Sequence, residues 1–159
     1  MTNRPVGTKG SWSWSDDSQV AVTAALDDGT YSGATETGTI GTAALIFGDV
    51  AYFATATSKW EKTNATAAST SGLKIAVCVQ AGDSDATGIK FLLYGKVRAD
   101  AAFPAFTIGE KVYLSAAGAG DLVTAAPTGT TGFVVRVVGY GNTADELFFT
   151  PENSYLVLA

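Results

Sequence analysis

The chain contains no histidine and only one cysteine among its 159 residues. The lack of histidine excludes Ser-His-Asp and Cys-His catalytic arrangements and removes the commonest protein ligand of transition metals. A single cysteine excludes an internal disulfide and a cysteine-based structural zinc site. Because Cys78 lies in an apolar stretch, we expect it to be a small buried hydrophobe and not a reactive thiol. We therefore expect no enzymatic activity and no cofactor.

Charged residues are also scarce, at 16% of the chain against roughly 25% in an average soluble domain. The ten Lys and Arg residues are scattered and the net charge is −5, which disfavours nucleic-acid binding because phosphates require clustered basic side chains. No apolar run approaches the roughly 18 residues of a membrane span, and the first residues lack the apolar segment of a secretion signal. We expect a soluble protein that is made in the cytoplasm and contacts no membrane.

Acids and aromatic residues on predicted loops suggest two binding functions to consider, calcium binding and carbohydrate binding. The acids at 16–17, 27–28 and 83/85 lack the spacing of a calcium-binding loop, so we expect them to be solvated turn residues. Aromatic side chains on loops could instead stack on a sugar, because a ring covers the apolar face of a carbohydrate. The candidates for such a site are Trp60, which we expect to be exposed between charged neighbours, Tyr31 and Tyr140. Ordinary packing at the rim is the alternative for all three.

The sequence does contain a short motif that occurs twice, 61 positions apart. Each copy has an apolar residue, a glycine, an acid, two further residues, a tyrosine and a large apolar residue. The glycine, acid and tyrosine are Gly48, Asp49 and Tyr52 in the first copy and Gly109, Glu110 and Tyr113 in the second. Glycine permits a sharp bend and the acid can bond neighbouring amides, so each copy predicts a turn that leads into a strand.

The same order of elements follows each copy of the motif. Apolar runs predict strands over 74–79 and 89–94 after the first copy, and over 133–138 and 146–149 after the second. The runs at 74–79 and 89–94 are continuous, which is typical of strands buried on both faces. This order predicts two related strand units, at about 39–99 and 100–159. Together they form the predicted domain over 36–159, an all-β, small antiparallel β-barrel.

Alternation along the two motif strands predicts which side chains face the core. Ala51 and Phe53 share the apolar face of the first copy, and Val112 and Leu114 share that of the second. We expect this face to point inward in both copies.

Three further segments carry predictions. Residues 29–41 are rich in Thr, Gly and Ser and predict a surface loop with a short extended piece. Residues 63–72 have little to fix them and predict a mobile loop. The apolar strand predicted over 154–158 must be paired, because it would otherwise be an adhesive edge.

Residues 1–35 form a predicted extended N-terminal arm together with the first strand. The first 15 residues are polar and interrupted by proline and glycine, which favours an arm without a core of its own. Residues 19–26 alternate, with Val20 and Val22 on one face, and predict a half-buried strand.

Two tryptophans near the start of the arm require an apolar environment. Trp12 and Trp14 share one face of any extended segment, because side chains alternate along it. They either pack against their own barrel or anchor the arm on a partner chain.

Five segments together resemble a known family. They are Gly-Asp-Val-Ala-Tyr-Phe at 48–53, Trp-Glu-Lys at 60–62, Ala-Thr-Gly-Ile-Lys-Phe-Leu-Leu-Tyr-Gly at 86–95, Ile-Gly-Glu-Lys-Val-Tyr-Leu-Ser at 108–115 and Pro-Glu-Asn at 151–153. Over about residues 39–158 the layout resembles the capsid decoration proteins of tailed bacteriophages, also called head-stabilising or auxiliary capsid proteins. A similar module occurs in tail fibres and other virion appendages.

The resemblance implies a β-tulip-like barrel and a structural, non-enzymatic role on the capsid surface of the virion. It implies a homotrimer, made in the host cytoplasm, that binds the major capsid protein on the outside of the assembled, expanded capsid and stabilises it. The expected capsid contacts, which no family motif supports, are Arg4, Pro5, Trp12, Trp14, Val20 and Val22. The alternative is a tail-fibre or head-fibre appendage module that binds a receptor or carbohydrate, and a hydrolase is a more remote one.

Overall fold

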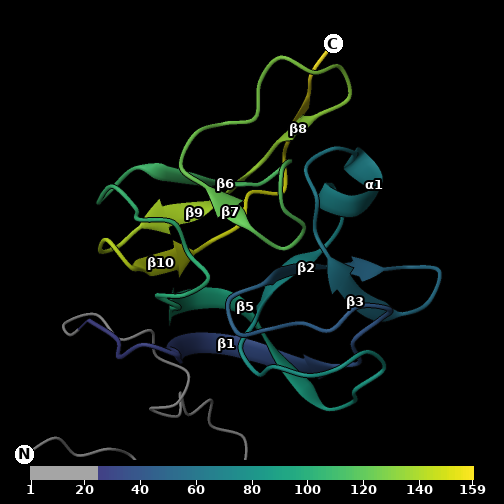
Figure 1. Cartoon of the computed structure of the whole chain (residues 1–159), viewed down its shortest axis with the longest axis vertical. Coiled ribbons are helices and arrows are strands. Elements are labelled where there is room, and N and C mark those ends of the chain that lie inside the picture. Colours follow the sequence, from purple (N-terminus) through teal and green to yellow (C-terminus); the bar gives the residue numbers. More distant parts are fainter. Residues whose placement is uncertain (1–24) are drawn as a thin grey trace, which may run out of the picture.

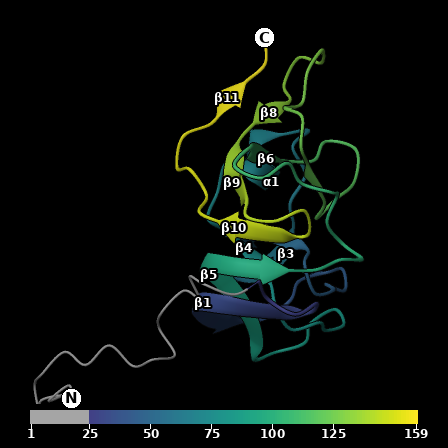
Figure 2. The same cartoon turned by 90° about the vertical axis from the view of Figure 1, so that its left-hand side faces the viewer.

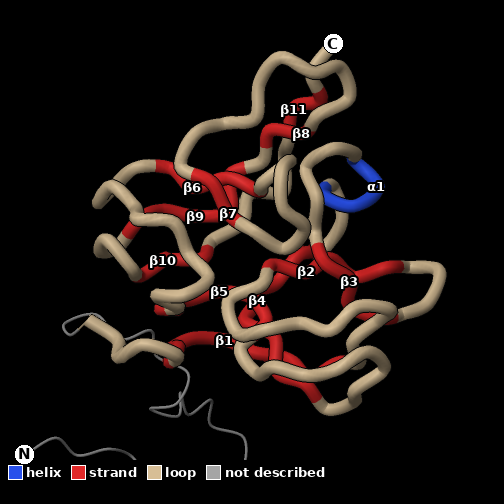
Figure 3. The backbone as a smooth tube through the Cα atoms, viewed as in Figure 1, coloured by secondary structure: helices blue, strands red, loops and turns tan. Residues whose placement is uncertain are grey.

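The computed structural model describes residues 25–159, and within them the chain is all-β, as the sequence predicts (Figure 1). The strand predicted over 19–26 lies almost wholly outside the described residues. The elements in chain order are β1 (Thr30–Gly38), β2 (Val50–Ala54), β3 (Lys59–Lys62), α1 (Ala68–Ser71), β4 (Ile75–Cys78), β5 (Ile89–Arg98), β6 (Lys111–Leu114), β7 (Leu122–Val123), β8 (Val134–Val135), β9 (Val137–Gly141), β10 (Glu146–Phe149) and β11 (Leu156–Val157). Long loops connect these short strands (Figure 3).

The ten-residue strand β5 joins the two halves of the chain. Its first part pairs with β4, where Leu92 lies opposite Val77, and its last part pairs with β10, where Val97 lies opposite Leu147. Strand β1 runs antiparallel along the other edge of β5 over its whole length. Elements from both halves of the sequence therefore share one sheet through β5 (Figure 1).

The sheet curls into a half-barrel, with the order β3-β2-β4-β5-β10-β9-β6-β7 (Figure 2). Backbone contacts outside the regular ladders link its remote parts. A parallel bridge between Ile40 and Trp60 joins the end of β1 to β3. The Val50 N–H donates to the Gly120 carbonyl at 2.8 Å, which connects β2 to the segment before β7. The curl therefore supplies backbone partners to segments that lie far apart in the sheet order.

Two apolar clusters fill the molecule. The N-terminal core consists of Ile40, Leu45, Ala51, Trp60, Ala76, Cys78, Ile89 and Phe91. The central core consists of Val50, Ala65, Ile75, Val77, Val79, Leu92, Val97, Phe106, Val112, Leu114, Leu122, Val138, Leu147 and Phe149. Strand β4 separates the cores and is buried on both faces, as its continuous apolar run predicts. The same prediction is wrong for 89–94, because Lys90 and Tyr94 of β5 are exposed.

A β-bulge changes which face of β5 points into the central core. The pairing with β1 passes from Ala34 opposite Tyr94 to Thr35 opposite Leu92, so Leu93 has no partner in the ladder. One extra residue reverses the alternation of side chains beyond it. Leu92 and Val97 consequently both point into the central core although their positions differ in parity.

The first motif strand differs from its prediction. Val50 and Tyr52 pack in or against the central core, while Ala51 and Phe53 pack in or against the N-terminal core, so both faces of β2 are covered. The expectation that only the Ala51 face points inward is therefore wrong for this copy. The reason is that β2 lies between two cores, whereas β6 borders only one.

The second motif strand agrees with its prediction. Val112 and Leu114 are buried in the central core, and Lys111 is exposed on the opposite face. Side-chain alternation was sufficient here because β6 has one apolar and one wet face.

Two segments predicted as loops are more ordered than expected. Residues 30–38 form the nine-residue strand β1 in place of the predicted surface loop, because the edge of β5 supplies its backbone partners. Residues 63–72 contain the one-turn helix α1, and both Ala65 and Ser71 are buried. Glycine weakens the strand preference of residues 30–38 and β-branched Thr weakens the helix preference of residues 63–72, and tertiary contacts overrode these local preferences in both segments.

The C-terminal strand is paired, as predicted, although it is not buried. β11 bonds to β8 in a separate two-stranded sheet. Leu156 and Val157 remain 60% and 45% exposed, so pairing satisfied the backbone of this strand without covering its side chains.

The close approach of β1 and β5 predicts a strong effect of one substitution. Gly33 lies opposite Gly95, and a Cβ on Gly33 would lie 2.1 Å from the Tyr94 carbonyl oxygen. We expect Gly33→Ala to lower the free energy of unfolding by about 2 to 3 kcal/mol, because the backbones must separate. Urea denaturation measures this loss.

The matched control is Gly88→Ala. Gly88 also has a positive φ, of +71°, but its added Cβ would meet no atom within 4 Å. Only the backbone conformation is penalised there, at about 1 kcal/mol. Equal losses for the two variants would show that the close approach of β1 and β5 is not the constraint.

Candidate functional site

The described chain begins on the outer face of β5 and β10, opposite the central core. Val97 and Leu147 point into that core, so the alternate residues Arg98 and Glu146 point outward. The Leu26 N–H donates to the Glu146 carboxylate at 2.7 Å, and the Arg98 guanidinium donates to the Leu26 carbonyl at 3.0 Å. Both backbone polar groups of Leu26 are thus held, and we call this position, which lies at the start of the described residues, the arm root.

Glu146 is fully buried although it lies on the outer face. Besides Leu26 it accepts a hydrogen bond from the Asn142 amide, and Lys96 Nζ lies 3.9 Å from its carboxylate. Its own N–H donates to Thr143 Oγ1 at 3.0 Å. Several hydrogen bonds and a nearby cation therefore compensate for the removal of this charge from water.

A second group of polar contacts holds the residues after the arm root. Arg98 forms two bonds with the Asp100 carboxylate, at 2.7 and 3.0 Å, and these lower the pKa of Asp100. The Asp100 N–H donates to Asp28 at 2.9 Å, and the Gly29 N–H donates to the Arg98 carbonyl at 3.0 Å. Asp28 and Asp100 are exposed and Arg98 is partly exposed, so these contacts contribute more to orientation than to stability.

Three aromatic side chains lie beside the arm root on the same outer face. Phe148 follows Glu146 by two residues along β10, and its ring meets Tyr94 of β5 edge-on at 5.3 Å. Tyr140 of β9 is the ladder partner of Phe148. Tyr94 and Tyr140 are 47% and 36% exposed. We call Tyr94, Phe148 and Tyr140 the aromatic stripe.

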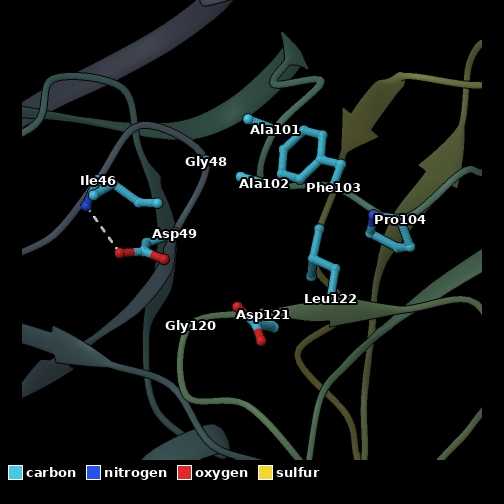
Figure 4. A pocket seen from close by; sticks show the side chains of 10 residues that line it. All are labelled: Ile46, Gly48, Asp49, Ala101, Ala102, Phe103, Pro104, Gly120, Asp121 and Leu122. Atoms are coloured by element: carbon cyan, nitrogen blue, oxygen red, sulfur yellow. Dashed lines mark hydrogen bonds between the residues drawn. The ribbon is translucent and has the colours of Figure 1, made fainter.

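The first motif is a structural element beside a cleft of about 320 Å³ (Figure 4). Gly48 has φ +98°, a conformation that favours glycine. Asp49 is buried, accepts the Ile46 N–H at 2.9 Å and pairs with Lys62 at 2.9 Å. Tyr52, at the end of the motif, packs against the central core. The motif therefore joins the turn, β2 and β3 through one buried carboxylate.

The second motif lacks this buried ion pair. Gly109 again has a positive φ, of +80°, but Glu110 is exposed. The Gly141 N–H donates to the Glu110 carbonyl at 3.0 Å, so the turn is held by backbone groups. Tyr113 is half-buried on β6. The two copies share a turn geometry but differ in how their acids are used.

The predicted sugar-stacking residues do not form one surface. Trp60 is 0% exposed and stacks on Phe91 at 4.7 Å, so the expectation of an exposed indole is wrong. Its charged neighbours lie on the other face of β3, and the indole fills the N-terminal core. Tyr31 is half-buried against the central core, and only Tyr140 remains available at the surface.

The predicted acid pairs form no metal site in the described part of the chain. Within residues 25–159 no three metal-ligating side chains gather. Asp85 pairs instead with Lys59 at 2.5 Å, and Asp28 caps the Asp100 amide. Asp16 and Asp17 lie outside the described residues.

Arg136 is a buried cation that sequence reasoning missed. Its guanidinium donates to three carbonyls, those of Ser71 and Leu73 at 2.6 Å and that of Glu152 at 2.9 Å. Burial lowers its pKa. The side chain thus joins the segment after α1 to the C-terminal segment. The position of this arginine inside the predicted strand 133–138 was the one feature of the sequence that could have indicated a buried, hydrogen-bonded cation, because a charged side chain is rarely buried in a strand without partners.

The expected capsid contacts Arg4, Pro5, Trp12, Trp14, Val20 and Val22 all lie outside the described residues, so their role stays a prediction. In the described part of the chain no helix is both long and apolar enough to cross a membrane. Comparison with protein-family models, with curated proteins and with solved structures finds no match. The function must therefore be argued from the site itself.

The contacts of the arm root predict that replacing Glu146 destabilises the protein more than replacing Glu110. We expect Glu146→Ala to lower the free energy of unfolding by about 2 to 3 kcal/mol, because the Leu26 amide and Lys96 lose their buried partner. Glu110→Ala, which removes an exposed acid, should change it by less than about 0.5 kcal/mol. Urea denaturation and hydrogen exchange at the Leu26 amide measure the two effects. Unchanged exchange at Leu26 in Glu146→Ala would contradict the arm-root assignment.

Cys78 predicts a pH dependence. Burial raises the pKa of its thiol to about 11 from 9.0. The folded protein should therefore fail to react with a thiol reagent at neutral pH, and the urea-unfolded protein should react at once. Because the unfolded thiol ionises at lower pH, the contribution of Cys78 to stability is constant below pH 9 and falls between pH 9 and 11. Fast labelling of the native protein at pH 7 would contradict this burial.

Proposed function

We propose that this protein is a capsid decoration protein of a tailed bacteriophage, which binds the outside of the assembled capsid and stabilises it. The observation that carries the proposal is the arm root. An all-β body holds both backbone groups of Leu26, and the residues before it in the sequence include two tryptophans. A body that anchors such a segment at one point suits a protein that joins neighbouring subunits.

Mass action explains how such a protein would stabilise a shell. A ligand that binds the assembled lattice and not the free subunits shifts the equilibrium towards the lattice. The arm can add a strand to the exposed sheet edge of the major capsid protein, with backbone bonds giving affinity and large side chains giving specificity. The proposed contacts are Arg4, Pro5, Trp12, Trp14, Val20 and Val22, and the proposed assembly is the homotrimer that the resemblance implies.

An appendage module that binds a receptor or carbohydrate is the second candidate. Tyr140 supports it, because this ring is exposed and can stack on a sugar. The burial of Trp60 weakens it, since the strongest candidate platform is inside the protein. A glycan-array signal that Tyr140→Ala abolishes would favour this candidate.

The decoration proposal is tested by adding the purified protein to empty expanded capsids that lack it. We expect saturable co-sedimentation, because binding sites on a lattice are finite. Deletion of residues 1–15 should weaken binding strongly, because it removes both tryptophans of the arm. Quantitative sedimentation over a range of protein concentrations gives the affinity of the intact chain and that of the chain without residues 1–15.

A control variant and two outcomes distinguish the role of the arm from the decoration role. Tyr155→Ser changes an exposed tyrosine at the other end of the molecule and should leave binding unchanged. Full binding without residues 1–15 would remove the arm from the mechanism while retaining the decoration role. No binding by the intact chain would reject the decoration role itself.

A further inference from the structure

The aromatic stripe is an exposed aromatic surface on the outer face of the sheet, beside the arm root. It crosses three neighbouring strands, β5, β10 and β9, through the ladder and ring contacts of Tyr94, Phe148 and Tyr140. Single exposed tyrosines need no explanation, but a continuous apolar stripe on a soluble protein marks a contact surface. The same face carries Lys111, the ladder partner of Tyr140.

We propose that the aromatic stripe is the docking surface for residues 12–24 of the same chain. The inference does not depend on the proposed function, because it concerns the protein without any partner. It assigns Trp12, Trp14, Val20 and Val22 an apolar site on their own body, and it makes Tyr94 and Tyr140 the residues that cover them.

The arm root places this segment at the edge of the stripe. Leu26 is bonded to Glu146, and Phe148 of the stripe is two residues further along β10. An extended strand advances about 3.3 Å per residue, so the 13 residues before Ala25 span about 40 Å at most. That length is ample to cross three strands spaced about 4.8 Å apart.

The charges of the stripe and of residues 12–24 are also complementary. Lys111 is exposed and has no acid within ion-pair distance among residues 25–159. The segment carries Asp16 and Asp17 between its tryptophans and its valines, and it contains no Lys or Arg from residue 12 to residue 24. An acidic, apolar segment and a stripe bordered by a lysine that has no acidic partner among residues 25–159 suit one another.

Tethering favours the same chain over a neighbouring copy. A segment joined to the body at Leu26 has an effective concentration near its own stripe in the millimolar range. Free copies at micromolar concentration cannot compete with this unless they make many more contacts. Modest contacts with three rings are therefore sufficient in the same chain.

Tryptophan fluorescence tests the proposal in the intact chain. The protein has three tryptophans, and Trp60 is 0% exposed, so it is a shielded internal reference. We expect Trp12 and Trp14 to be protected from acrylamide quenching in the unchanged protein. The double variant Tyr94→Ser with Tyr140→Ser should expose them, with a red-shifted emission and a larger quenching constant.

Two controls keep the result interpretable. Tyr155→Ser removes a 42% exposed tyrosine outside the stripe and should leave quenching unchanged. Trp12→Phe with Trp14→Phe isolates Trp60, whose emission should be the same with and without the stripe substitutions if the body remains folded.

Three outcomes would overturn the proposal. Quenching of Trp12 and Trp14 in the unchanged protein as fast as that of a free tryptophan derivative would show that the segment does not dock. Protection that survives the double tyrosine substitution would place the docking site elsewhere. Protection that disappears on dilution would assign the stripe to a second copy of the chain.

Discussion

The structure depends on β5, a strand that pairs with neighbours along both of its edges. β5 pairs with β1 along one edge and with β4 and then β10 along the other. The bulge at Leu93 allows this, because it reorients the second half of the strand so that Leu92 and Val97 face the same core. Without that change of face, one half of β5 would direct apolar side chains into water.

Three of the buried charged residues each have a defined structural role. Asp49 joins the first motif to Lys62, and Arg136 joins the segment after α1 to the C-terminal segment. Glu146 holds the arm root. No buried side-chain nitrogen or oxygen of the described residues lacks a hydrogen-bond partner. These groups fix long loops that their own low-complexity sequences cannot order.

The outer face of β5, β10 and β9 combines a fixed origin for the arm with an exposed aromatic stripe. The proposed function uses the arm on a capsid, and the further inference places the same segment on its own body. The two are compatible as alternative partners for one set of side chains. Under the two proposals together, the segment would cover its tryptophans on its own body before assembly and exchange those contacts for contacts on a lattice.

The sequence by itself determined the all-β class, the turns at Gly48 and Gly109, the double burial of the 74–79 run and the inert environment of Cys78, because these follow from local patterns and backbone geometry. Only the tertiary structure decided that residues 30–38 form a strand, that Trp60 is buried and that both faces of β2 are covered. The arm root was also beyond sequence reasoning, because Leu26 and Glu146 are 120 positions apart. Such contacts depend on which strands become neighbours, and an alternating pattern specifies two faces without specifying what lies against either one.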